Sequence, residues 1–99
     1  MGIRIQSIHF DATKALEQFI QKKVSKLEVF YGEILETEVI LKLVKPETAQ
    51  NKEALVKVKI SGSELFASKV SDTFEESIDS AIEALQKQLI KIKEKNRTK

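Results

Sequence analysis

The sequence predicts an α+β fold, a single domain of order β-α-β-β-β-α with a four-stranded sheet and two helices packed on one face. Apolar residues recur at every second position in four segments, as in strands, and at every third or fourth position in two longer segments, as in helices. A helix separates the first two strands, which favours a parallel pair, whereas the later links are short enough for antiparallel hairpins. Placing both helices on one face of one sheet buries both apolar stripes.

The first strand and the first helix follow each other directly. Residues 3–10, IRIQSIHF, begin as a strand, with a slip in the phase of the alternation. Residues 10–31 switch to helical spacing. Thr13 or Asp11 can cap the start of this helix, and Gly32 is a natural stop. The apolar stripe of the helix consists of Leu16, Phe19, Ile20, Val24, Leu27 and Tyr31.

The next three strands alternate in the same way. Residues 36–45 form one strand, which Pro46 ends, and a polar loop follows. Residues 54–60, ALVKVKI, form the clearest strand, and 65–71 return after a short hairpin turn around Gly62. In the clearest strand the apolar residues alternate with lysines, so we expect the sheet face opposite the helices to be polar. Those lysines are Lys57 and Lys59.

The last element is a long helix. Asp72 caps its start, and Glu75 three residues on completes a pair like a capping box. Its apolar stripe consists of Phe74, Ile78, Ala81, Ile82, Leu85, Leu89 and Ile92.

Length and composition bound the class of protein. The 99 residues fit one domain, for which we expect the bounds 1–95, followed by a basic and disordered tail at 96–99. No apolar run approaches the length of about 20 residues that a membrane span needs. There is no cysteine and no secretory signal pattern at the N-terminus. These features predict a cytoplasmic protein without a membrane partner.

The charges are separated along the chain, although the net charge is only +2. Residues 87–99 hold six bases against one acid. On a helix, Lys87, Lys91 and Lys95 form one ladder on a solvent flank, with Gln88 at its edge. Lysines of the first helix form a second cluster, and the two clusters would merge if the helices pack side by side. The second cluster consists of Lys22, Lys23 and Lys26. Two solvated helix faces would explain the same pattern equally well.

Residues for catalysis are scarce. His9 is the single histidine, and no carboxylate spacing marks a catalytic dyad or a metal cluster. The three glycines are isolated, so no loop is suited to hold phosphate. The phenylalanines fit core positions rather than the stacking pairs of an RNA-recognition sheet. We therefore expect no enzyme activity, no cofactor, no metal and no small-molecule substrate. Backbone and shape recognition by basic helices is the remaining mode of binding nucleic acid.

The residues also carry a family resemblance over almost the whole chain. The stretches IRIQSIHFDATKALEQFI, KKVSKLE, TEVILKLVK, ALVKVKISGSELFAS and AIEALQKQLIKIKEK, in this order, resemble the short ribosome hibernation promoting factors, a family that includes ribosome-associated inhibitor A. The resemblance implies a protein that binds the small ribosomal subunit against 16S rRNA, in the channel of mRNA and tRNA. It further implies reversible inactivation of translation under stress or in stationary phase, with a second hibernation factor as a possible partner.

The resemblance also implies which residues contact rRNA. They are Lys23, Lys26, Lys87, Gln88, Lys91 and Lys95, to which helix geometry adds Lys22. The sequence departs from the family pattern at two of its positions. Ala84 stands where relatives often carry lysine, and Lys87 stands where they often carry arginine. A lysine supplies charge but not the bidentate phosphate geometry of arginine, so we expect a weaker or differently distributed RNA contact.

Two other classes of function stay open on the residues alone. One is a generic module for double-stranded RNA, and the other is a protein-interaction domain that uses the open sheet face. Within the resembling family, both pairing of ribosomes and idling of single ribosomes remain compatible with this sequence.

Overall fold

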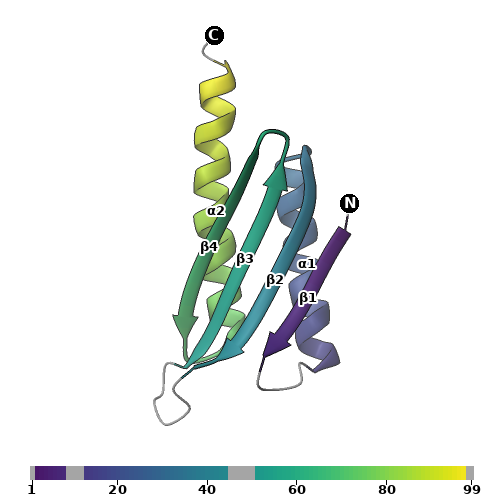
Figure 1. Ribbon diagram of the computed structural model, residues 1–99, viewed down its shortest axis with the longest axis vertical. Coiled ribbons are helices and arrows are strands. Elements are labelled where there is room, and N and C mark those ends of the chain that lie inside the picture. Colours follow the sequence, from purple (N-terminus) through teal and green to yellow (C-terminus); the bar gives the residue numbers. More distant parts are fainter. Residues whose placement is uncertain (1, 9–12, 45–50, 98–99) are drawn as a thin grey trace.

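The computed structural model describes residues 2–8, 13–44 and 51–97 and has the predicted element order. The four strands form one sheet, against which the two helices pack (Figure 1). The elements are β1 (Gly2–Ile8), α1 (Lys14–Phe30), β2 (Ile34–Leu43), β3 (Lys52–Ile60), β4 (Ser63–Ser71) and α2 (Phe74–Arg97). The sheet order is β1-β2-β3-β4, in which β1 and β2 run parallel and the other neighbours antiparallel, as predicted.

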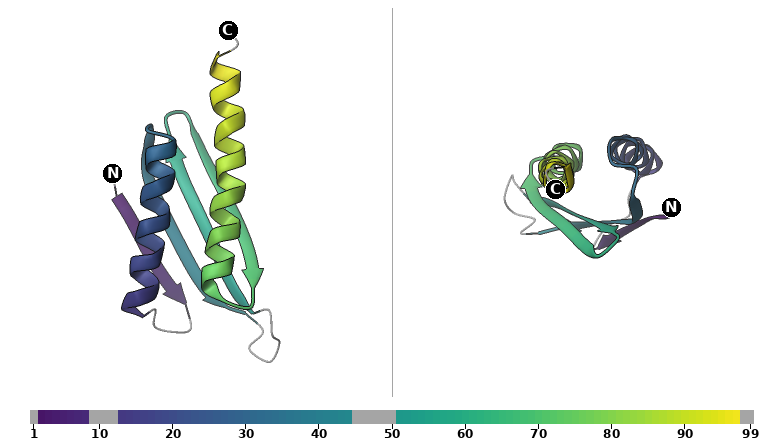
Figure 2. Two further views of the ribbon diagram at one scale, coloured as in Figure 1. Left: turned by 180° about the vertical axis from the view of Figure 1, so that it is seen from behind. Right: turned by 90° about the horizontal axis from the view of Figure 1, so that it is seen from above.

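Both helices cover the same face of the sheet (Figure 2). The core lies between this face and the helices, and the residues with alternating or helical spacing fill it as predicted. Its fully enclosed side chains come from both helices and the two central strands. They include Ile20, Val24, Leu27, Val39, Leu41, Val56, Val58, Ile78, Leu85 and Leu89.

Each helix starts at a threonine. The Thr13 hydroxyl accepts a hydrogen bond from the backbone N–H of Leu16 at 3.1 Å, which confirms one of the two predicted caps, whereas Asp11 lies outside the described residues. The Thr73 hydroxyl accepts one from the N–H of Glu76 at 3.1 Å. The predicted Asp72 cap is therefore wrong by one residue. A capping side chain must stand directly before the first helical residue to reach the free N–H groups, and that residue is Phe74.

The ends of the helices lie close to the expected positions. α1 ends at Phe30, and its cap residue Tyr31, which is extended, donates its N–H to the Leu27 carbonyl at 2.9 Å. Gly32, the predicted stop, follows this cap directly. α2 extends to Arg97, and the expected bounds of the domain at 1–95 and of a tail at 96–99 stay a prediction. Basic residues at the C-terminal end of a helix complement its dipole and favour this continuation.

The β3–β4 hairpin turns at Ser61 and Gly62, and Gly62 has a φ of 81°. This left-handed conformation suits glycine, because a residue with a Cβ atom would be strained there. The turn pairs Ile60 with Ser63 and sets the register of the hairpin. Ala67 therefore lies on the helix side, and Phe66 lies on the open face.

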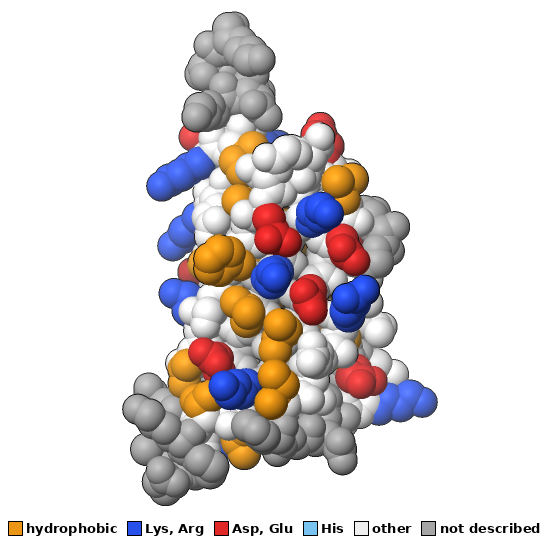
Figure 3. All heavy atoms as spheres, viewed as in Figure 1, with side chains coloured by type: hydrophobic (Ala, Val, Ile, Leu, Met, Phe, Trp, Pro, Cys, Tyr) orange, Lys and Arg blue, Asp and Glu red, His pale blue; other side chains and the backbone are white. Residues whose placement is uncertain are grey.

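The open face of the sheet is polar on one half only, which corrects the expectation of a uniformly polar surface. Lysines and glutamates alternate on the half near the β3–β4 turn, where the Lys57 Nζ lies 4.0 Å from a carboxylate oxygen of Glu38. On the other half Figure 3 shows gathered hydrophobic side chains. Phe66 is 63% exposed and helps to line a shallow groove of about 300 Å³ with Leu55. Side chains alternate between the two faces of a strand, and Leu55 and Phe66 are out of phase with the buried residues. Both side chains must therefore lie on the open face.

Candidate nucleic-acid interface

The lysines of α1 lie on the side of the helix that faces solvent and α2. Lys22 and Lys26 are exposed, whereas Lys23 is half-buried. One helical turn separates Lys22 from Lys26, so the two ammonium groups share a face. We call Lys22, Lys23 and Lys26 the α1 track.

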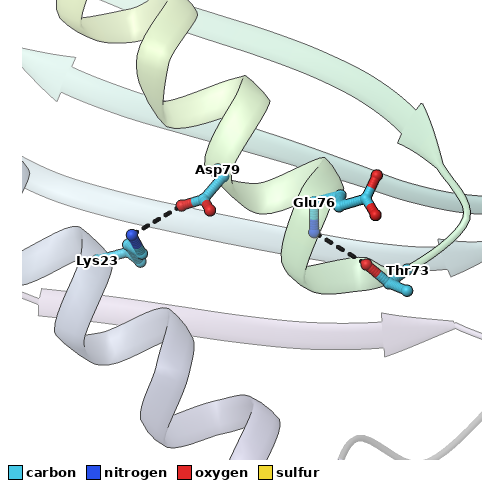
Figure 4. A network of polar contacts seen from close by, with 4 residues as sticks. All are labelled: Lys23, Thr73, Glu76 and Asp79. Atoms are coloured by element: carbon cyan, nitrogen blue, oxygen red, sulfur yellow. Dashed lines mark hydrogen bonds and ion pairs between the residues drawn. The ribbon is translucent and has the colours of Figure 1, made fainter.

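Lys23 has two partners within the protein. Its Nζ lies 2.9 Å from the Asp79 Oδ1 on α2 (Figure 4). The same Nζ lies 5.5 Å from the centroid of the Phe19 ring. The ammonium group of Lys23 thus lies beside both a carboxylate and the face of an aromatic ring. Lys23 therefore connects the two helices in the free protein.

A groove of about 330 Å³ separates α1 from α2 on the outer surface. Leu27 and Ile82 contribute apolar lining. The α1 side carries Lys23 and Lys26, and the α2 side carries two carboxylates and an amide. Those α2 residues are Asp79, Glu83 and Gln86. The groove consequently has a basic wall and an acidic wall.

The lysines predicted on α2 lie on a different flank of that helix. Lys87 and Lys91 are exposed, and the side chain of Lys95 lies outside the described residues. At about 100° per residue, Lys91 lies about 140° around the helix from Gln86, which lines the groove. We call Lys87, Lys91 and Lys95 the α2 ladder.

Gln88 shows which element of the fold lies next to the α2 ladder. Its side-chain amide donates to the Phe66 carbonyl of β4 at 3.4 Å. This flank of α2 therefore overlies the edge strand of the sheet. Gln88 was predicted as an RNA contact. In the free protein its amide instead donates a hydrogen bond to a backbone carbonyl of the edge strand β4.

The two basic groups do not form the merged surface that side-by-side helices were expected to give. Asp79 and Glu83 stand between them. Asp79 pairs with Lys23 of the α1 track, and a Glu83 carboxylate oxygen lies 4.0 Å from the Lys87 Nζ of the ladder. We call Asp79 and Glu83 the acidic crest. The helix layer thus carries two basic strips with an acidic strip between them.

Lys93 is a contact that sequence reasoning did not assign. Its Nζ donates to the Phe30 carbonyl at 3.4 Å and lies 5.1 Å from the centroid of the Phe30 ring. It therefore places a positive charge at the C-terminal end of α1, where the helix dipole favours a cation. Helical spacing could have indicated that Lys93 faces α1, because it falls on the same side of α2 as Ile82 and Gln86.

Other kinds of site are not seen in the part of the chain that the structure describes. These residues contain no group of three metal-ligating side chains. None of the described helices combines the length and the apolar character that a membrane crossing needs. His9 lies outside the described residues.

Comparisons with known proteins give the family of the chain. A family model described as Sigma 54 modulation protein / S30EA ribosomal protein matches residues 3–97. The chain is 34% identical over 95 residues to the ribosome hibernation promoting factor of Azotobacter vinelandii, covering 96% of this chain and 85% of the relative. It is 32% identical to the ribosome hibernation promoting factor of Escherichia coli strain K12, covering 96% of each.

Solved structures show the same fold. A ribosomal subunit interface protein from Coxiella burnetii is similar with a TM-score of 0.84 and 27% identity, over 94% of this chain and 98% of that one. The N-terminal domain of Protein Y from Thermus thermophilus has a TM-score of 0.79 at 20% identity, over 93% and 99% of the two chains, which supports the fold alone. With residues 3–97 matched and full-length relatives above 30% identity, the chain belongs to the Sigma 54 modulation protein / S30EA ribosomal protein family.

Proposed function

We propose that this protein binds the small ribosomal subunit in the channel of mRNA and tRNA, against 16S rRNA, and reversibly inactivates translation in stress or stationary phase. Its family consists of ribosome-associated translation regulators rather than enzymes. Relatives across nearly the full chain are named ribosome hibernation promoting factors, and a structural neighbour is named a ribosomal subunit interface protein. A bound domain in this channel inhibits by occupying the place of mRNA and tRNA, which needs no catalytic residue.

The α2 ladder is the observation that carries the proposal. Lys87 and Lys91 are exposed on one flank, one turn apart, and lie off the apolar stripe of α2. Like charges at this spacing destabilise an isolated helix by about 0.2–0.5 kcal/mol per pair, so packing does not explain the arrangement. Phosphate groups along an RNA backbone would neutralise the ladder and release bound counterions. The α1 track would supply further phosphate contacts from Lys22, Lys23 and Lys26.

The test compares two triple variants by co-sedimentation with small subunits at one fixed salt concentration. Replacing the α2 ladder, in Lys87→Gln, Lys91→Gln and Lys95→Gln, keeps helix propensity near that of lysine. Losing three phosphate contacts should lower affinity on the order of 100-fold at about 0.1 M salt. The fold should survive, because the described ladder side chains are exposed.

The matched control removes three lysines from the open sheet face. Lys42→Gln, Lys57→Gln and Lys59→Gln make the same change in net charge on the side away from the helices. We expect its affinity to stay within about threefold of the unmodified protein. Equal losses in the two variants would mean that charge acts only in bulk, and a larger loss in the control would place the binding surface on the sheet.

The exposed Phe66 favours one alternative, a protein-interaction domain that uses the open sheet face. An aromatic side chain beside a shallow groove is a typical anchor of a protein interface. Phe66→Ser separates the two functions. The helix-surface proposal expects unchanged co-sedimentation of this variant with small subunits. A domain that reaches the subunit through its open sheet face expects a strong loss, and a domain specific for another partner expects no co-sedimentation even of the unmodified protein. A generic module for double-stranded RNA would bind duplexes but would not travel with ribosomal subunits in a gradient.

A further inference from the structure

The acidic crest is unexpected on a surface proposed to bind RNA. Asp79 and Glu83 are exposed on α2 and have side-chain exposures of 54% and 73%. Neither is needed to fill the core. Each instead lies beside a lysine of a different basic strip, Asp79 beside Lys23 and Glu83 beside Lys87.

This arrangement places a penalty on RNA that approaches the middle of the helix layer. A phosphate that reaches Lys23 must displace the Asp79 carboxylate and then remain close to it. Glu83 also lines the groove with Lys26, so a backbone that follows the groove meets two carboxylates. Like charges at an interface suppress unsuitable partners, and specificity arises from such repulsion as well as from attraction.

A flexible single strand and a folded RNA site respond differently to this penalty. An unstructured strand gains affinity wherever positive charge is continuous, and the crest interrupts that continuity between the α1 track and the α2 ladder. A folded RNA can present two backbone segments at fixed positions, one to each basic strip. Such a partner keeps both sets of contacts and does not place phosphate over the crest.

We infer that Asp79 and Glu83 determine specificity: they weaken binding to unstructured RNA and thereby favour a folded RNA that offers two separate backbone segments. The inference rests on the proposed function, since it concerns the same helix surface. In this inference the two acids reject unstructured RNA. The Asp79 carboxylate competes with RNA phosphate for the ammonium group of Lys23.

The experiment measures binding of a labelled oligouridine and of purified small subunits by the double variant Asp79→Asn, Glu83→Gln. For single-stranded RNA, each phosphate contact steepens the slope of log affinity against log salt concentration by about 0.7. At about 0.1 M salt one such contact is worth about fivefold in affinity, so each freed lysine should raise oligouridine affinity about fivefold. The double variant should bind oligouridine about 25-fold more tightly, with a log–log salt slope steeper by about 1.4. Its affinity for small subunits should rise much less than its affinity for oligouridine, because a folded RNA already contacts both basic strips without placing phosphate over the acidic crest.

A control for bulk charge uses Glu17→Gln with Glu33→Gln. Both residues are exposed, Glu17 in the first turn of α1 and Glu33 after its end, and neither lines the groove. This variant gains the same two units of charge but frees neither Lys23 nor Lys87, so oligouridine affinity should rise less than about threefold. An equal gain in this control would overturn the inference.

A second control assigns the gain to one lysine. Adding Lys23→Gln to Asp79→Asn should abolish the increase that Asp79→Asn alone produces, since the freed ammonium group is then missing. Persistence of the gain would overturn the inference, as would an unchanged oligouridine affinity in the double variant or an equal gain on oligouridine and subunits. Failure of the proposed function is seen separately, as absent co-sedimentation of the unmodified protein with small subunits.

Discussion

At the level of single residues, two threonine hydroxyls hold the starts of the two helices. Thr13 and Thr73 each accept a hydrogen bond from the N–H three residues on, which satisfies a donor that the helix itself leaves free. The sequence indicated that caps were present, because Ser, Thr, Asp and Asn favour this position. It did not identify Thr73, since both Asp72 and Thr73 are suitable caps, Asp is the more favoured of the two, and the position at which the backbone turns decides between them.

The cap of α2 gives the first prediction about stability. Thr73→Ala should lower the free energy of unfolding by about 1 kcal/mol, since the N–H of Glu76 loses its acceptor. Asp72→Ala, one residue earlier, should change it by less than about 0.5 kcal/mol, as for a surface residue without a special contact. Urea denaturation of both variants measures the difference. A loss in Asp72→Ala that equals or exceeds the loss in Thr73→Ala would contradict the assigned cap.

At the level of elements, periodicity predicted which face of each helix is buried, because burial and helical spacing are directly linked. The stripe of α2 packs against the sheet as expected, while Ile90 points away and remains 40% exposed. Contacts between helices were not predictable in the same way. The Lys23–Asp79 and Lys93–Phe30 pairs depend on how α1 and α2 are rotated toward each other, which the pattern of one helix does not contain.

Adjacent residues of α2 test this distinction between faces. Leu89 is fully buried, so Leu89→Ala should lower the free energy of unfolding by about 2–5 kcal/mol through lost transfer energy and a residual cavity. Ile90→Ala removes a partly exposed side chain and should change it by less than about 1 kcal/mol. Thermal or urea unfolding of the two variants provides the comparison. Similar losses would show that the helix is rotated relative to the sheet.

At the level of the whole molecule, the distribution of charge over the surface says more about binding than the net charge does. The net charge is only +2, yet the helix layer carries the α1 track and the α2 ladder, separated by the acidic crest. The sequence predicted both basic clusters from spacing alone. It did not predict their separation, because Asp79 and Glu83 gain their position from the packing of α2 beside α1.

This distribution predicts a salt-dependent interaction with small subunits. With five or six lysines at phosphates, the logarithm of the affinity should fall against the logarithm of salt concentration with a slope of roughly −4 to −5. Replacing the α2 ladder by glutamine should make the slope shallower by about 2 to 3 units, since three contacts are lost. Co-sedimentation across a series of salt concentrations measures both slopes. A slope near zero for the unmodified protein would exclude binding through the basic strips.

The parallel pairing of β1 with β2 also affects how the chain folds during its synthesis. Gly2 pairs with Glu36 and Ile8 with Lys42, so β1 is made first but has no partner until α1 and nearly all of β2 have been synthesised. The antiparallel pairs of β2 with β3 and of β3 with β4 close over shorter loops, and short loops form quickly. We therefore expect β1 to lack a sheet partner in the nascent chain and to dock after the crossover helix and the three antiparallel strands have formed.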